Sequence, residues 1–135
     1  MSIEKAIINL ITSNEAINAL IVGRLYPVYL PQGAALPAIA YQLIDAPQQT
    51  TTDGPLGLTD ATYQFNCFAA THAALIELTE AMILLLANYH GVIEGVTIQG
   101  TQIIGRRDIP ALDDQAEQSS RYGRLIECTI SFNES

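Results

Sequence analysis

The feature that most restricts the fold is the alternation of apolar and polar residues in two separate segments, Thr62–Ala69 and Arg124–Phe132. Successive side chains of a β-strand point to opposite faces, so each segment is predicted to be a strand with one face in the core. Ala38–Asp45 is predicted to be a third strand. Val92–Arg107 contains three glycines and is predicted to be a strand pair or one bulged strand. The residues expected on the buried face of the first two strands are Tyr63, Phe65, Cys67, Ala69, Ile126, Cys128, Ile130 and Phe132.

Three segments are predicted to be helices. Thr71 is a suitable N-cap for the longest of them, which is expected to run from His72 to Tyr89. Apolar residues at helical spacing predict a first short helix from Ile3 and a second after Ser13. The apolar arc of the longest helix is wide, and one sheet covers only one side of a helix. We therefore expect a second partner on that helix, either the N-terminal helices or a neighbouring subunit.

Helices and strands are segregated along the chain and do not alternate as βαβ units. This order predicts a single α+β domain over residues 1–135. Its sheet is expected to be mainly antiparallel, with about four strands packed against one long helix and with two short N-terminal helices. Arg24–Pro37 contains three prolines and is predicted to be an extended connector.

The surface of such a domain must be poor in charge, because 15% of the residues are charged and 49% are hydrophobic. A monomer with this surface tends to associate, so we expect a partner to cover part of it. The formal net charge of −8 disfavours specific binding to nucleic acid or to an anionic membrane. The sequence has neither a membrane-span pattern nor a secretory-signal pattern, so we expect assembly in the cytoplasm.

Residues that could carry chemistry are few. The GxSxG, HExxH, P-loop and GxGxxG patterns are absent from the sequence, so we expect neither an enzyme nor a cofactor. His72 and His90 flank the longest helix about five turns apart, too far for a shared metal site. Cys67 and Cys128 are expected to be buried free thiols, with a cross-strand disulfide or a metal site as alternatives. The acidic segment 108–117 lacks the pattern of a calcium loop and is predicted to be solvated.

Two polar stretches, Ala46–Asp60 and Pro110–Ser120, are predicted to be long loops that become ordered when they meet a partner. Arg106 and Arg107 are expected at a strand end, either as a plain surface pair or in contact with phosphate or a partner carboxylate. Together with the outer side of the longest helix, these segments supply the predicted contacts with subunits and partners. The predicted contact residues are Ile76, Glu80, Ile83, Leu84, Ala87, Gln48, Thr51, Asp53, Arg106, Arg107, Asp113 and Asp114.

Four short motifs occur in a characteristic order. GRLYP at Gly23–Pro27 follows two short helices, and PQGAALP at Pro31–Pro37 precedes the first predicted strand. YQFNCFA at Tyr63–Ala69 precedes a helix, and RYGRLI at Arg121–Ile126 leads into the last strand. With this order, nearly the whole chain resembles the tail-completion, or tail-terminator, family of long-tailed bacteriophages and prophages.

The resemblance implies a compact α+β subunit that forms a ring, commonly a hexamer, at the head-proximal end of the tail tube. Such a ring stops tube polymerisation and presents the surface that binds the head. The implied partners are further copies of the chain, the tail-tube protein and a head-closure or neck protein. The implied location is the virion, after assembly in the bacterial cytoplasm. No catalytic residue is carried over by the resemblance.

Two other functions remain open at the level of sequence. The first is another neck or head-closure connector protein, since size and composition fit it equally. The second, of a different class, is a small-molecule-binding α+β module. Its pocket would lie between the longest helix and the sheet, lined by Tyr41, Phe65 and Met82.

Overall fold

The computed structural model describes residues 3–46, 59–109 and 121–134. Six strands form one sheet in the order β1-β2-β3-β6-β5-β4. β1 runs parallel to β2, and the other neighbouring pairs are antiparallel. The elements are α1 (Ile3–Thr12), α2 (Glu15–Ile21), β1 (Leu25–Pro27), β2 (Ala38–Asp45), β3 (Thr59–Ala69), α3 (His72–Leu86), β4 (Gly91–Ile93), β5 (Val96–Ile109) and β6 (Tyr122–Glu134).

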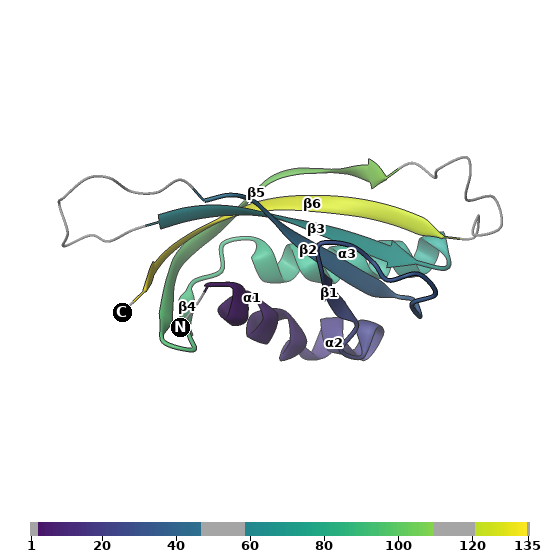
Figure 1. Ribbon diagram of the computed structural model, residues 1–135, viewed down its shortest axis with the longest axis horizontal. Helices are drawn as coiled ribbons and strands as arrows, with labels where there is room; N and C mark the ends of the chain where they lie inside the picture. Colours follow the sequence, from purple (N-terminus) through teal and green to yellow (C-terminus); the bar gives the residue numbers. More distant parts are fainter. Residues whose placement is uncertain (1–2, 47–58, 110–120, 135) are drawn as a thin grey trace.

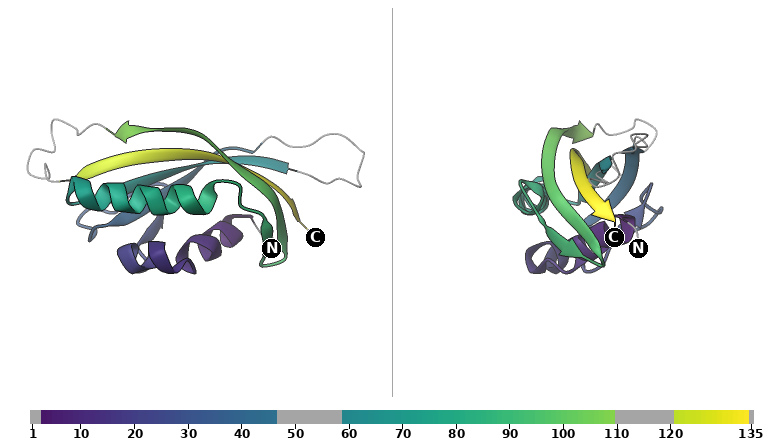
Figure 2. Two further views of the ribbon diagram at one scale, coloured as in Figure 1. Left: turned by 180° about the vertical axis from the view of Figure 1, so that it is seen from behind. Right: turned by 90° about the vertical axis from the view of Figure 1, so that its left-hand side faces the viewer.

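The sheet is curved, and α1, α2 and α3 lie on one of its faces (Figure 1). The view along the long axis in Figure 2 shows the sheet curling around the helices as a half-barrel. Bulges contribute to this shape, because β5 has register shifts between Ile98 and Gly100 and between Ile103 and Gly105. An extra residue in one strand bends it and increases its twist.

This architecture corrects the predicted fold class of about four mainly antiparallel strands packed against one long helix. The sheet has six strands and is mixed, and it is accompanied by helices of 10, 7 and 15 residues. The strands beyond four, β1 and β4, are three-residue strands at the two edges of the sheet. β4 pairs with the bulged strand β5, so both alternatives predicted for Val92–Arg107, a strand pair and a bulged strand, describe part of the structure. β1 lies within Arg24–Pro37, which was expected to be a connector. An edge strand tolerates Pro27 at its end because one side of its backbone has no neighbouring strand to pair with.

Helix α3 begins where predicted and ends earlier than predicted. The Thr71 hydroxyl accepts a hydrogen bond from the Ala74 N–H at 3.1 Å, which confirms the N-cap. The helix ends at Leu86, before the predicted Tyr89. The backbone leaves the helix at Ala87, which is extended, and at Asn88, which has a positive φ of 61°. Thr101 of β5 binds this end, because its hydroxyl donates to the Leu86 carbonyl and accepts from the Tyr89 N–H, the latter at 2.8 Å. Thr101 thereby satisfies two backbone groups that a longer helix would have paired.

The core lies between the sheet and the helices. β3 and β6 contribute the alternating residues predicted for it, and both cysteines are buried and free, as predicted. Burying one large aliphatic or aromatic side chain contributes about 1.5–3 kcal/mol. Helical residues of the core are Ile7, Ile11, Ile17, Ile21, Leu75, Leu78, Met82 and Leu86.

Candidate functional site

Helix α3 is bordered by a groove on each side. The groove of about 540 Å³ between α2 and α3 is named the α2–α3 groove, and the groove of about 390 Å³ between α3 and the β5–β6 pair is named the α3–sheet groove. The α2–α3 groove is lined by Asn14, Ala16, Glu77, Glu80, Ala81, Leu84, Leu85, Ala87, Asn88 and Tyr89. The α3–sheet groove is lined by Ile76, Thr79, Glu80, Ile83, Arg106, Arg107, Asp108 and Arg124.

The α2–α3 groove has an exposed leucine in an apolar setting. Leu78 and Leu86 face the core, whereas the Leu84 side chain is 83% exposed. Around it the groove is lined by small side chains such as Ala16 and Ala81, with carboxylates nearby on α3. A partner that buried Leu84 would gain about 1.5–3 kcal/mol from this residue. The groove is therefore suited to an apolar side chain of another protein.

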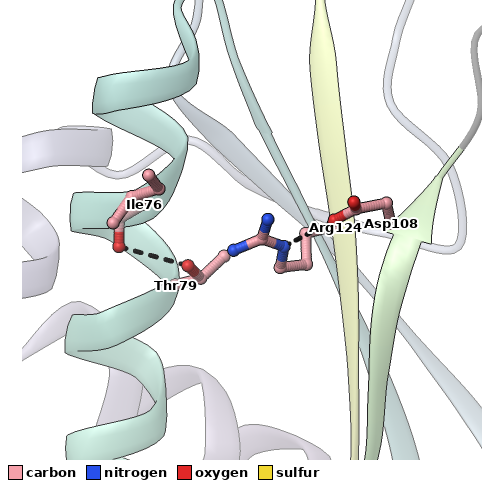
Figure 3. Close-up of polar contacts among 4 residues, drawn as sticks. All are labelled: Ile76, Thr79, Asp108 and Arg124. Atoms are coloured by element: carbon pink, nitrogen blue, oxygen red, sulfur yellow. Dashed lines mark hydrogen bonds and ion pairs between the residues drawn. The ribbon is translucent and has the colours of Figure 1, made fainter.

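The α3–sheet groove contains an ion pair. Arg124 Nε donates a hydrogen bond to Asp108 Oδ1 at 2.7 Å. The Arg124 side chain extends from β6 toward Thr79 on α3, as Figure 3 shows. The Thr79 hydroxyl donates to the Ile76 carbonyl at 3.1 Å. Because Asp108 is largely exposed, the pair orients the guanidinium more than it stabilises the fold.

The second β5 bulge decides which arginine of β5 lies on the same face of the sheet as Arg124. Ile103 lies opposite Cys128 on the core face, and simple alternation would bring Arg107 to that face. The bulge inserts one residue, so that Arg106 lies opposite the core residue Ile126 instead. Asp108, two residues further, has the same orientation. After the bulge, the side chains of Arg106 and Asp108 therefore lie on the face of the sheet on which Ile103 lies before it.

Positive charge is concentrated at this end of the molecule. Arg106, Arg107, Arg121 and Arg124 lie near the adjacent ends of β5 and β6, and they are four of the chain's six Lys and Arg residues. The Arg121 guanidinium lies 5.3 Å from the ring centroid of Phe68, a cation–π contact. In a chain with a formal net charge of −8, this cluster is a local reversal of sign.

The groups with shifted pKa values belong to the core and are not among the residues that line the α3–sheet groove. Burial raises the pKa of Cys67 to about 12 and that of Cys128 to about 11. Burial, together with the hydrogen bond that its hydroxyl donates to Glu4 at 2.8 Å, raises the pKa of Tyr41 to about 12. Burial also raises the pKa of Tyr63. Both thiols therefore stay protonated near neutral pH and are poor nucleophiles or metal ligands.

Within residues 3–46, 59–109 and 121–134, no group of three or more His, Cys, Asp or Glu side chains is placed to hold a metal ion. In the same residues, no helix combines the length and apolar character needed to cross a bilayer. His72 contacts the Tyr122 ring edge-on at 5.7 Å between centroids, and His90 is exposed.

The structure brings together five of the predicted contact residues in the α3–sheet groove: Ile76, Glu80, Ile83, Arg106 and Arg107. Leu84 and Ala87 line the α2–α3 groove, which also includes Glu80. The predicted contacts Gln48, Thr51, Asp53, Asp113 and Asp114 lie outside the described residues. The residues suggested for a small-molecule pocket belong to the core and line neither groove: Tyr41, Phe65 and Met82.

Thr79, Asp108 and Arg124 line the α3–sheet groove but are not among the predicted contact residues. The position of Arg124 could have been predicted from the sequence. Arg124 is two residues before Ile126, and it therefore lies on the same face of the strand as Ile126 and the buried residues that follow. Thr79 is buried on α3, and no local pattern links it to the ends of β5 and β6.

Comparisons with known proteins show that this chain resembles solved structures in its fold. Neither a family model nor a curated protein matches the sequence. Fifteen chains of solved structures match the fold. One of them belongs to the virion of a native gene transfer agent particle, with a TM-score of 0.70 and 12% sequence identity, and the match covers 97% of this chain and 94% of that chain. The chain therefore shares its whole fold with a component of that virion.

Proposed function

We propose that this chain is a structural, non-enzymatic protein of a phage-like virion. The observation that carries the proposal is the similarity of fold over nearly the whole chain to a component of a gene transfer agent virion. The resemblance of the motifs to tail-completion proteins supports a finer assignment. In it, copies of the chain form a ring, most simply a hexamer, at the head-proximal end of the tail tube, where the ring ends tube growth and joins the tail to the head.

The α2–α3 groove supports the assembled state. A ring is built from heterologous contacts, in which one surface of a subunit meets a different surface of the next. Leu84 is the most exposed of the large apolar side chains in the described residues, and it lies beside a groove with space for a partner side chain. A small, charge-poor subunit with such a surface is better suited to a contact than to free solution.

Deletion of the encoding sequence from its phage or prophage tests the assignment. If the chain is a tail terminator, its deletion is expected to give tail tubes of uncontrolled length that do not join to heads. Electron microscopy of lysates measures both the tube length and the joining. If the chain is a head-closure protein, its deletion is expected to give tails of normal length and unjoined heads. This result would replace the tail-terminator assignment with a head-closure role. Normal, infectious particles from the deletion would contradict a structural role altogether.

Variants of exposed apolar residues test the groove. Leu84→Asp is expected to abolish self-association because a carboxylate cannot be buried in an apolar contact. Val22→Asp is the matched control, because Val22 is 64% exposed and lies outside both grooves. Light scattering and negative-stain microscopy of both purified variants measure the assembled state. Equal assembly of the two variants would exclude Leu84 from the subunit contact.

A further inference from the structure

We propose that the α3–sheet groove binds the acidic end of a second copy of this chain, so that copies associate head to tail through opposite charges. The inference rests on the proposed function in that it names the surfaces that join neighbouring subunits. The groove is a space of about 390 Å³ lined by apolar side chains, by Arg106, Arg107 and Arg124, and by the carboxylates of Glu80 and Asp108, so that its arginines outnumber its carboxylates. A carboxylate on a neighbouring protein is the natural ligand for such arginines.

Arg106 and Arg124 lie on the face of the sheet that carries the helices, and they differ in what they already bind. Arg124 is held by Asp108 at 2.7 Å, and its side chain is 25% exposed. Arg106 is exposed, and within the described residues its guanidinium has no side-chain partner. The bulge in β5 turns Arg106 to the same face as Arg124. Arg106 is therefore oriented by the fold and available to an incoming carboxylate.

The opposite end of the molecule supplies the matching charge. Glu4, Asp45, Asp60 and Glu94 lie at the start of α1, the end of β2, the start of β3 and the β4–β5 turn. These element ends lie on the side of the molecule opposite the β5–β6 end that carries the arginines, and they extend from the start of β3 down to the β4–β5 turn (Figure 1).

Hydrogen bonds from neutral side chains orient three of these carboxylates without cancelling their charge. Glu4 accepts from Tyr41 at 2.8 Å, Asp60 from Ser131 at 2.6 Å, and Glu94 from Asn9 at 3.1 Å. The acidic end therefore presents preorganised acceptors, and the net charge of this surface is negative.

The separation of the two charged ends requires a contact between different surfaces. Asp60 lies seven residues before Cys67 on β3, and Cys67 is the register partner of Arg124. At about 3.3 Å per residue this separates the acidic and basic ends by about 23 Å. A contact between such ends is heterologous, and it continues from copy to copy until a ring closes. The same four arginines are too few, in a chain of net charge −8, to favour DNA over a carboxylate partner.

Single neutralisations test the basic end. Arg106→Gln is expected to raise the dissociation constant of self-association about tenfold, as measured by sedimentation velocity of the full chain. Lys5→Gln is the charge-matched control, because it removes the same charge at the acidic end of the molecule, and it is expected not to weaken association. Circular dichroism and the Tm of each variant verify that the fold is retained.

A mixing experiment identifies the partner surface. The variant Arg106→Gln/Arg107→Gln retains the acidic end, and the variant Asp45→Asn/Asp60→Asn retains the basic end. Each is expected to be monomeric alone, and an equimolar mixture is expected to form a 1:1 dimer that grows no further. A mixture that remains monomeric overturns the head-to-tail contact.

The outcomes separate this inference from the proposed function. Wild-type assembly that is unchanged by Arg106→Gln overturns the charged contact and leaves the ring standing. Binding of a 20-base-pair DNA duplex that is lost with Arg106→Gln, in the absence of any mixed dimer, assigns the groove to phosphate and overturns the inference. Wild-type chains that remain monomeric at all concentrations overturn both the ring and its contact. Head-to-tail assembly, with normal particles after deletion of the encoding sequence, overturns only the virion role.

Discussion

Thr101 has a structural role that is large for one hydroxyl group. It lies on β5 with its side chain buried, and it accepts a hydrogen bond from the Tyr89 N–H while donating to the Leu86 carbonyl. Both of these groups lie at the end of α3, where the helix provides no partners of its own. Thr101 therefore connects the end of the helix to the sheet.

We expect Thr101→Val to destabilise the fold by about 1–3 kcal/mol, because the isosteric side chain leaves a buried carbonyl and a partly buried N–H unsatisfied. The free energy of unfolding in urea measures this loss. Thr97→Val is a suitable control on the same strand, since Thr97 is only half-buried and has no side-chain hydrogen bond within the described residues. Equal losses for the two variants would contradict the role of Thr101.

The buried thiols make stability depend on alkaline pH. The pKa of Cys67 rises from the ordinary 9.0 to about 12 in the folded chain, and that of Cys128 to about 11. Above pH 9 the unfolded chain loses these protons and the folded chain keeps them. Stability is therefore complete below about pH 9 and is lost as the pH rises toward the folded pKa values.

The expected loss is about 1.4 kcal/mol per thiol at pH 10 relative to pH 7. Denaturant titrations at the two pH values measure it, and the double variant Cys67→Ala/Cys128→Ala is expected to lose much less. Alkylation provides a second measurement, because the native thiols are expected to resist iodoacetamide at pH 8 and to react once unfolded. Rapid reaction of the native protein would show that the thiols are accessible.

Among the elements, α3 separates the core from the contact surface. Its residues Leu78, Met82 and Leu86 pack on the sheet, and Leu84 on the same helix is 83% exposed. The helix is apolar on more than one side, and the single sheet covers only part of it. α2 packs beside it without covering Leu84.

Two leucines on α3 provide a matched comparison. Leu78→Ala is expected to cost about 2–5 kcal/mol because it leaves a cavity in the core. Leu84→Ala is expected to change the free energy of unfolding of the monomer by less than about 0.5 kcal/mol, since the side chain is already in water. Thermal or urea unfolding at low protein concentration measures both. A similar cost for both variants would mean that Leu84 is covered by its own chain.

At the scale of the whole molecule, charge is distributed unevenly along the long axis. Four arginines lie near the adjacent ends of β5 and β6, and the elements at the other end carry carboxylates. Because the two ends are about 23 Å apart, farther than a Debye length of about 10 Å at 0.1 M salt, they act as separate surfaces.

Self-association through these ends is expected to weaken severalfold between 0.05 and 0.5 M NaCl, because salt screens exposed charges. Sedimentation velocity at the two salt concentrations measures the change. Apolar contacts such as the one proposed for Leu84 are not weakened by salt, so the single variant Arg106→Gln, which is expected to associate still with about tenfold lower affinity, is expected to show a smaller salt effect. An association constant independent of salt would contradict the charged contact.

Much of the local structure could be predicted from local patterns. β2 has the predicted bounds, Ala38–Asp45, and β3 and β6 contain the predicted strands and extend beyond them. The strand number and the sheet type could not be predicted, because three-residue edge strands such as β1 are too short to show a period. The register shift at Ile103 and Gly105 was equally hidden, since it depends on pairing with β6.

The sequence by itself determined which residues are buried in β3 and β6, where α3 begins and how poor in charge the surface is, because these properties follow from neighbours along the chain. Only the tertiary structure decided that Ile76, Thr79, Arg106, Asp108 and Arg124 border one groove. They come from three elements, and their meeting depends on strand register and on a bulge. Register is set by contacts between distant segments, and no local pattern records it.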